Sequence, residues 1–169
     1  MTMTTQRALS RICTCILLTI LVLARTAMPA AADELLAIRN ATDPAQAEVR
    51  FSEADLLALP QVTIRTRTEF TDGVVEFVGP LARHAIAFID VGSATTIHLV
   101  AANDYAIDIP FSDLTDYDVI LALQANGERL TIRDKGPIWL MYPLDDHAEL
   151  QDPMYNNRLI WQLTHIELR

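Results

Sequence analysis

Residues 62–80, with the sequence VTIRTRTEFTDGVVEFVGP, carry the clearest structural signal of the chain. Over residues 62–70, apolar or threonine side chains alternate with polar or charged ones, which is the period-two pattern of a strand with one buried face. Asp72-Gly73 is a turn dipeptide, and it predicts a hairpin into a second strand over residues 74–78. The centre of the chain is therefore expected to be an antiparallel strand pair.

Helices are expected on both sides of this hairpin. Ser52 and Asp55 have the spacing of a capping box, so a short helix should begin after Ser52 and end before Pro60. Pro80 suits the first turn of a helix, because its missing N–H would have no partner there. A second helix is therefore expected over residues 81–89.

The rest of the chain has the pattern of short strands separated by turn residues. Asn126-Gly127 is the strongest short hairpin signal, residues 102–104 form a further turn, and residues 152–158 a helical turn. The expected strands are 95–101, 105–109, 119–123, 129–133, 138–142 and 159–168. Many short strands with few short helices predict an α+β fold, a mixed, strand-rich sheet domain.

The N-terminus has the three parts of a secretory signal peptide over residues 1–32. Arg7 and Arg11 are positively charged, residues 12–24 form an apolar run, and small residues precede Asp33. A membrane anchor is the alternative, but about 20 apolar residues are needed to cross a bilayer and this run has thirteen. We therefore expect a periplasmic or secreted protein with no stable membrane anchor after cleavage.

Composition limits both the size and the partners of the protein. The chain has 169 residues, which suits one domain, and 22 acidic against 13 basic side chains. Nucleic acid is not an expected partner, because binding it needs clustered positive charge. Cys13 and Cys15, the two cysteines, lie in the expected signal peptide, so no thiol chemistry is expected in the mature protein.

Residues 33–51 show no clean period and are expected as an N-terminal leader before a domain over residues 52–169.

Motifs in a fixed order give residues 59–168 a resemblance to a known family. The motifs are Leu59-Pro60, Phe77-Val78-Gly79-Pro80-Leu81, Asn103-Asp104-Tyr105-Ala106-Ile107-Asp108-Ile109-Pro110, Asn126-Gly127, Gly136-Pro137 and Trp161-Gln162-Leu163. In this order they resemble the molybdopterin-binding domain of sulfite-oxidase-type oxidoreductases, and more closely the small exported proteins that carry this domain alone. The resemblance implies the fold of that domain and molybdopterin as the family's cofactor.

The residues disagree with the catalysis that this resemblance implies. Catalytic members of the family hold molybdenum through the pterin and one protein cysteine, which in this chain would lie within residues 66–73. That stretch contains no cysteine. We therefore expect no cofactor in the isolated protein and a non-catalytic sensory or accessory module that binds a small ligand or a partner. The alternative is a molybdopterin-dependent oxidoreductase whose metal is held without cysteine.

Two cations are the first candidates for a binding site. Arg133 and Lys135 lie in the sequence RDKGP, and the resemblance places this segment beside the cofactor cleft. Together they would clamp a small anionic ligand, Arg133 through its bidentate fork and Lys135 as a point charge. The alternative is a solvated turn in which Asp134 neutralises both neighbours.

A turn and an aromatic side chain complete the candidate cofactor-binding or ligand-binding set. Asn103, Asp104 and Tyr105 offer an amide, a carboxylate and a phenol at the entrance of a strand, which suits the orientation of a small polar ligand. The alternative is a tight turn with Tyr105 packed in the core. Tyr142 is expected in an apolar wall near the same cleft, with core packing as its alternative.

No catalytic or metal-binding residue is predicted. Asp145, Asp146 and His147 are adjacent, but adjacent side chains seldom reach one ion, so a solvated acidic loop is expected there. The expected partner is a small anionic ligand, or a signalling protein of the periplasm or the membrane.

Overall fold

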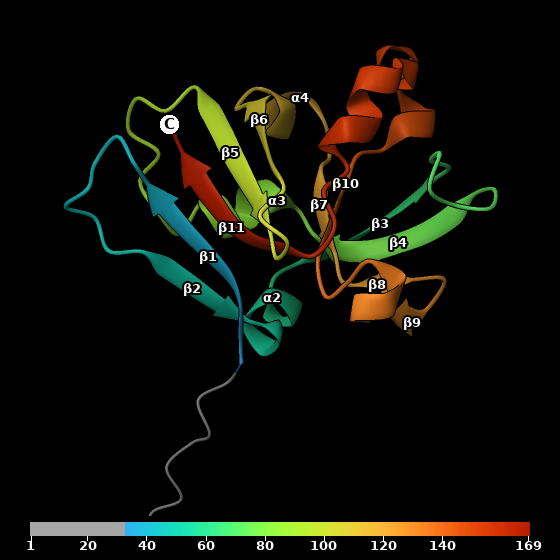
Figure 1. Cartoon of the computed structure of the whole chain (residues 1–169), viewed down its shortest axis with the longest axis horizontal. Helices are drawn as coiled ribbons and strands as arrows, with labels where there is room; N and C mark the ends of the chain where they lie inside the picture. Colours follow the sequence, from blue (N-terminus) through green and yellow to red (C-terminus); the bar gives the residue numbers. More distant parts are fainter. Residues whose placement is uncertain (1–32) are drawn as a thin grey trace, which may run out of the picture. The chain divides into compact units, whose positions relative to one another are not determined.

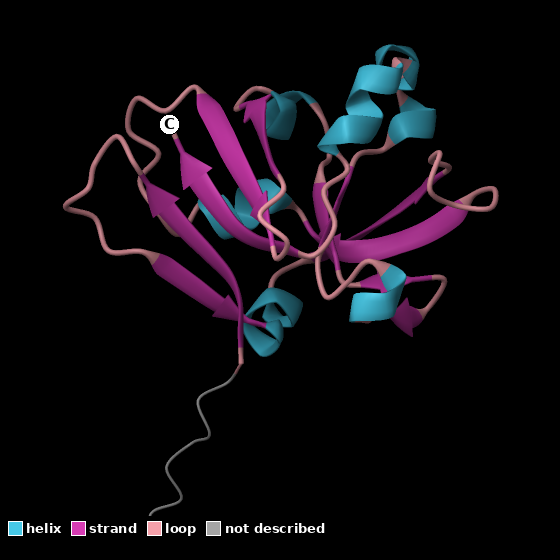
Figure 2. Cartoon of the chain, in the orientation of Figure 1, coloured by secondary structure: helices cyan, strands magenta, loops and turns pink. Residues whose placement is uncertain are grey.

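The computed structural model describes residues 33–169, and the signal peptide expected over residues 1–32 lies outside this range. Strands dominate the described chain, and its helices are short (Figure 2). Within this part of the chain, no helix is long and apolar enough to cross a membrane.

The largest sheet has five strands in the order β2-β1-β11-β5-β6 (Figure 1). Its strands are β1 (Glu34–Asn40), β2 (Val49–Ser52), β5 (Thr96–Ala101), β6 (Ala106–Pro110) and β11 (Leu163–Leu168). β1 and β11 run parallel, with Ile38 opposite Ile166, and the other neighbouring strands are antiparallel. The first and last described strands are therefore neighbours in the sheet.

The other strands form a four-stranded sheet, β3-β4-β8-β9, and a two-stranded sheet, β10-β7. Their bounds are β3 (Gln61–Thr66), β4 (Val75–Pro80), β7 (Ile120–Ala122), β8 (Gln124–Ala125), β9 (Glu128–Arg129) and β10 (Trp139–Met141). β7 lies close against β4: a Cβ added at Gly79 would be 1.9 Å from the Leu121 carbonyl oxygen. Glycine at position 79 therefore permits this approach of the two backbones.

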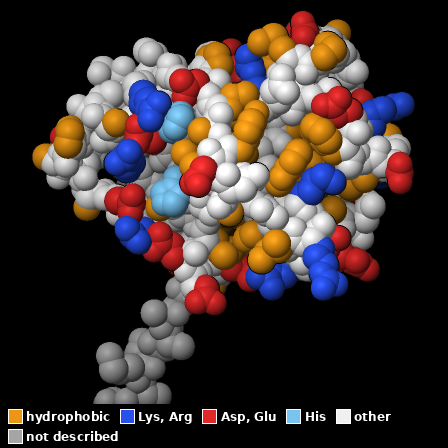
Figure 3. Space-filling model, viewed as in Figure 1, with side chains coloured by type: hydrophobic (Ala, Val, Ile, Leu, Met, Phe, Trp, Pro, Cys, Tyr) orange, Lys and Arg blue, Asp and Glu red, His pale blue; other side chains and the backbone are white. Residues whose placement is uncertain are grey.

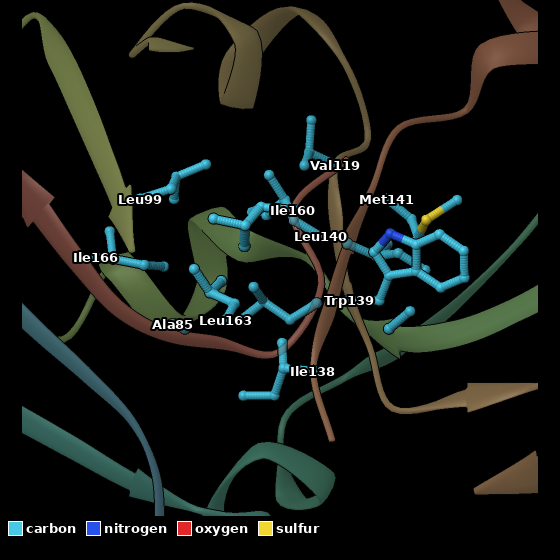
Figure 4. Packing of buried hydrophobic residues seen from close by; sticks show 14 of the residues in the cluster. Ala85, Leu99, Val119, Ile138, Trp139, Leu140, Met141, Ile160, Leu163 and Ile166 are labelled. Carbon is cyan, nitrogen blue, oxygen red and sulfur yellow. The ribbon is translucent and has the colours of Figure 1, made fainter. Parts of the chain in front are cut away.

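Short helices and one continuous core join these sheets. The helices are α2 (Glu53–Ala58), α3 (Ala82–Ile86) and α4 (Asp113–Asp116), with 3-10 turns η1 (Ile132–Asp134), η2 (Leu144–Asp146), η3 (Ala148–Gln151) and η4 (Pro153–Arg158). Ile166 of β11, Ala85 of α3 and Leu140 of β10 belong to the same buried cluster (Figure 4). The observed architecture confirms the expected α+β class, with strand-rich sheets and short helices.

The expected leader over residues 33–51 is instead part of the large sheet. Leu36, Ala37 and Ile38 are consecutive and all buried: Leu36 and Ile38 belong to the core, and the small Ala37 lies on the opposite face beside charged side chains such as Arg39 and Glu167. Side chains buried in succession show no polar-apolar alternation, so these residues carry no strand period. The domain in the structure therefore begins at the start of the described chain.

The central hairpin is confirmed as an antiparallel pair, but its details differ from the prediction. β3 ends at Thr66, which lies opposite Val75, so residues 67–74 form a loop and not a two-residue turn. Pro80 is the last residue of β4, and the next helix begins at Ala82. The helix expected over residues 81–89 is therefore present but shorter, and Pro80 lies in the preceding strand and not in the first helical turn. The capping box between Ser52 and Asp55 is present as predicted.

The outer face of the five-stranded sheet carries a row of alternating charges. Cross-strand neighbours place Arg39, Glu167, His98 and Asp108 side by side across four strands. Glu167 forms ion pairs with Arg39 and Arg169, and His98 Nδ1 lies 2.6 Å from Asp108 Oδ1. Figure 3 shows histidine and charged side chains of both signs gathered over this part of the molecule. Opposite charges on neighbouring strands favour this register.

Glu167 should make the fold dependent on pH in the acidic range. Burial opposes its charge, but hydrogen bonds from Arg169 and Arg39 hold the pKa of Glu167 below its ordinary value. Such a carboxyl stabilises the fold above its unfolded pKa of about 4.3, and this contribution is lost as the pH falls through the lower, folded pKa. We expect Glu167→Gln to lower the free energy of unfolding at neutral pH, with the difference from the unmodified protein shrinking on acidification. Urea unfolding of both proteins across this range is the measurement, and a pH-independent difference would contradict it.

Candidate functional site

A small pocket lies where the β5–β6 turn meets two distant segments of the chain. Its volume is about 250 Å³, slightly below the roughly 300–1,000 Å³ of sites for drug-sized ligands, so it suits a smaller molecule. It is lined by residues from the β3–β4 loop, the end of β5 and the turn after it, η4 and the segment after η4: Phe70, Ala101, Asn103, Tyr105, Asn156, Asn157, Leu159, Ile160 and Trp161. None of these side chains carries a charge, so the pocket suits a neutral molecule.

Phe70 and Trp161 form an aromatic wall of the pocket, and Trp139 and Lys135 pack against this wall on the side away from the pocket. Phe70 and Trp161 meet edge to face, with ring centroids 5.2 Å apart, and Trp161 makes the same kind of contact with Trp139 at 6.4 Å. Lys135 Nζ lies 5.1 Å from the centroid of the Trp139 ring and donates a hydrogen bond to the Phe70 carbonyl oxygen at 3.3 Å. The ammonium group therefore fixes the loop that presents Phe70, and it holds the wall in place.

Amide groups form the polar rim of the pocket. Asn103 Oδ1 accepts a hydrogen bond from the Tyr105 backbone N–H at 3.2 Å, which shapes the turn. The Tyr105 hydroxyl donates to the Asn157 carbonyl oxygen at 3.2 Å, so this hydrogen bond joins the turn to η4. Within residues 33–169, the side-chain amides of Asn156 and Asn157 make no hydrogen bond, and both remain available to a ligand.

The structure places the six candidate residues from the sequence in different parts of the molecule. Asn103 and Tyr105 line the pocket, and Asp104, with a positive φ of 64°, is exposed at the turn between them. Lys135 lies behind the aromatic wall, where it contacts Phe70 and Trp139. Arg133 and Tyr142 lie elsewhere: Arg133 lines a separate surface groove, and Tyr142 is fully buried.

Tyr142 belongs to a buried cluster that the sequence did not reveal. Its hydroxyl donates to Asp113 Oδ2 at 2.7 Å, and Arg158 forms an ion pair with the same oxygen. The side chains of Arg158 and Asp113 are only 12% and 7% exposed. Burial, together with the negative charge of Asp113, raises the pKa of Tyr142 well above its ordinary value, so the phenol remains a hydrogen-bond donor.

The cluster of Tyr142, Asp113 and Arg158 holds η4, which contains the rim residues Asn156 and Asn157, in place. Arg158 ends η4, directly after Asn156 and Asn157, and its guanidinium stacks 4.4 Å from the centroid of the Tyr155 ring. Burial disfavours the charge on Arg158, but the facing carboxylate of Asp113 keeps its pKa raised. Because Asp113 lies in α4, the ion pair anchors η4 to an element 45 residues away in sequence. No local pattern could have predicted this pairing.

The acidic residues after Pro143 have a structural role. Asp145 Oδ2 accepts hydrogen bonds from the backbone N–H and the side chain of Arg67, at 3.3 and 3.2 Å. The Asp145 backbone N–H donates to Thr66 Oγ1 at 3.1 Å. In the described part of the chain, no three histidine, cysteine or carboxylate side chains are grouped so that they could hold a metal ion. Asp145 therefore ties η2 to the start of the β3–β4 loop.

Comparison with known proteins supports the fold. No model of a known protein family and no curated protein matches the chain. The crystal structure of the sulfane dehydrogenase SoxCD from Paracoccus pantotrophus matches 81% of this chain and 38% of its own, with a TM-score of 0.60 and 19% identity. The two proteins share a fold. The chain thus spans well under half of that protein's length, and the likeness supports a distant relation to the sulfite-oxidase-type fold suggested by the motifs.

The residues present do not fit the cofactor that the resemblance implies. The β3–β4 loop, where the family carries its cysteine ligand, contains no thiol, and the side chains of Thr68 and Thr71 in it bind each other and the loop backbone. Molybdopterin also carries a phosphate, which is usually held by cations or by several backbone N–H groups. No positively charged side chain lines the pocket. This loop and this pocket therefore offer neither a thiolate for the metal nor a cationic partner for the phosphate.

Proposed function

We propose that this protein is an exported, single-domain module that binds a small ligand and has no redox catalysis of its own. The observation that carries the proposal is the pocket of Phe70, Tyr105 and Trp161, which combines an aromatic wall with free amides and no charged lining. An aromatic surface with a few convergent polar groups is typical of sites for small molecules. The lack of a thiol in the β3–β4 loop supports the non-catalytic part of the proposal.

The lining favours a neutral ligand over the anion expected from the sequence. Arg133 lies outside the pocket, and the Lys135 ammonium is engaged with the Phe70 carbonyl and the Trp139 ring. A ligand that suits the site has a flat apolar part to lie on Trp161 and hydrogen-bonding groups for Asn156 and Asn157. Its small size follows from the volume of about 250 Å³.

Ligand binding can be measured through the stability of the protein and its fluorescence. A neutral, flat heterocyclic amide is expected to raise the melting temperature, since a ligand at 100 times its Kd adds about 2.7 kcal/mol to the free energy of unfolding. Inorganic phosphate and small carboxylates should have no such effect. Because the two tryptophans of the chain, Trp139 and Trp161, lie in or behind the wall, binding should also change the intrinsic fluorescence.

Variants separate a pocket ligand from binding elsewhere. Asn156→Ala removes a rim amide and should weaken the response without changing the melting temperature of the free protein. Trp161→Ala should abolish the rise in melting temperature that the ligand causes. Phe88→Ala, at an exposed aromatic residue outside the pocket, should leave this rise unchanged. A response that survives Trp161→Ala would contradict the assignment of the pocket. Stoichiometric molybdenum and pterin in the purified protein would overturn the non-catalytic proposal in favour of an oxidoreductase.

A further inference from the structure

An exposed isoleucine marks a second surface of the molecule, distinct from the pocket. Ile132 in η1 is 73% exposed, the highest value among the large hydrophobic side chains of residues 33–169. It borders an open groove of about 640 Å³, to which Leu35 and Pro137 contribute further apolar surface and Arg129 and Arg133 the basic groups. Apolar surface exposed beside polar groups is typical of an interaction site.

The turn that presents Ile132 is held in a fixed conformation. The Thr131 carbonyl oxygen accepts hydrogen bonds from the backbone N–H groups of Asp134 and Gly136, at 2.9 and 2.7 Å. Gln162 Nε2 donates to the Ile132 carbonyl oxygen at 3.0 Å. The backbone therefore needs no ordering when a partner binds, which lowers the entropic cost of association.

The groove is positively charged although the chain as a whole has a formal charge of −9. Arg129 is neutralised by an ion pair with Glu53, whereas Arg133 forms no ion pair with any described residue. Asp134, its neighbour, is occupied by a hydrogen bond from the Thr131 hydroxyl at 2.5 Å. No carboxylate lines the groove. Arg133 is therefore a free guanidinium at the rim of an apolar surface.

We propose that this groove docks an acidic segment of a partner protein, in which an apolar side chain packs on Ile132 and a neighbouring carboxylate binds Arg133. Charge complementarity selects this occupant, because a guanidinium pairs with a carboxylate in a bidentate geometry. The charge of Arg133 disfavours a basic segment in the groove. A wholly polar segment would leave the Ile132 side chain exposed to water. The proposal does not depend on the ligand pocket, since the groove and the pocket share no lining residue.

Fluorescence anisotropy with labelled peptides tests the proposal. The probe is a peptide in which leucine alternates with aspartate, and the comparison peptides replace aspartate by lysine or leucine by serine. The first peptide should bind the protein, and each replacement should weaken its binding about tenfold or more. Equal binding of the lysine peptide, or no binding of the first, would overturn the proposal.

Protein variants locate the binding surface. Arg133→Glu and Ile132→Ser should each weaken the binding of the aspartate-leucine peptide about tenfold or more and leave the melting temperature of the protein unchanged. Arg65→Glu makes the same charge change at an exposed position of β3 and should leave the affinity within about twofold. Equal losses for Arg65→Glu would show non-specific attraction. If Ile132→Ser instead dissociates a dimer in sedimentation experiments, the groove holds a second copy of the chain, and the proposal fails.

Discussion

Replacing Arg158 by alanine is expected to lower the free energy of unfolding by about 3–5 kcal/mol. The substitution leaves the Asp113 carboxylate buried, with only the Tyr142 hydroxyl as a remaining side-chain partner. An uncompensated buried charge is costly, because the protein interior solvates it poorly. The same change removes the anchor of η4, so the rim of the ligand pocket should loosen as well.

Urea unfolding of Arg158→Ala measures this effect, and three further variants make the result specific. Arg50→Ala removes an arginine whose two ion pairs lie at the surface, and it should destabilise the protein far less than Arg158→Ala. Tyr142→Phe removes one hydrogen bond to Asp113 and should cost about 1–3 kcal/mol. The double replacement of Asp113 and Arg158 by leucine should recover much of the loss, because no buried charge remains. A cost for Arg158→Ala no larger than that for Arg50→Ala would show that the ion pair is not buried.

Gly79→Ala is expected to destabilise the protein by about 3 kcal/mol or more, beyond the usual cost of an added methyl group in a core. The new Cβ would lie 1.9 Å from the carbonyl oxygen of Leu121 and 2.6 Å from its carbonyl carbon. Both are backbone atoms, so no side-chain rotation relieves the overlap. β7 would have to move away from β4, and the core residues that β7 carries would move with it.

A matched glycine variant separates this contact from the general cost of replacing glycine. Gly73→Ala also adds one methyl group, but nothing lies within 4 Å of it, and only the positive φ of 75° opposes the change. Its expected cost is about 1 kcal/mol. Chemical unfolding of both variants is the measurement. If Gly79→Ala costs no more than Gly73→Ala, β4 and β7 are further apart than the structure places them.

Signals confined to a few neighbouring residues predicted local structure well. Ser52 and Asp55 bind each other's backbone as the capping box requires, and Asn126-Gly127 forms a hairpin turn with positive φ at both positions. The turn at residues 102–104 joins two strands as expected. These features depend on hydrogen bonds and dihedral preferences within three or four residues, so the sequence determines them almost alone.

Long-range packing decided the features that the sequence missed. Residues 33–51 had no period because Leu36, Ala37 and Ile38 are buried in succession, and β1 pairs with a strand from the far end of the described chain. Pro80 was expected in the first turn of the helix that follows, but it ends β4, where it lies opposite Gln61 of β3. A proline is compatible with both positions, and only the neighbouring strand distinguishes them.

In the candidate site, too, the features set by neighbouring residues were predictable and those set by long-range packing were not. Asn103 and Tyr105, which the sequence selected from a local turn, both line the pocket. Arg133 and Lys135, which it grouped because they are close in the chain, lie apart. Lys135 has a positive φ of 67°, and it contacts the aromatic wall while Arg133 lines the groove. The pairing of Asp113 with Arg158 has no sequence signal at all.

The sequence by itself determined the α+β class, the turns at residues 102–104 and 126–127, and the absence of a thiol from the β3–β4 loop. Only the tertiary structure decided which distant segments form the pocket, which arginine is buried and which remains free. Turn and strand preferences act between near neighbours in the chain. The pairing of buried charges and the lining of a pocket depend on segments that meet only after the core has packed.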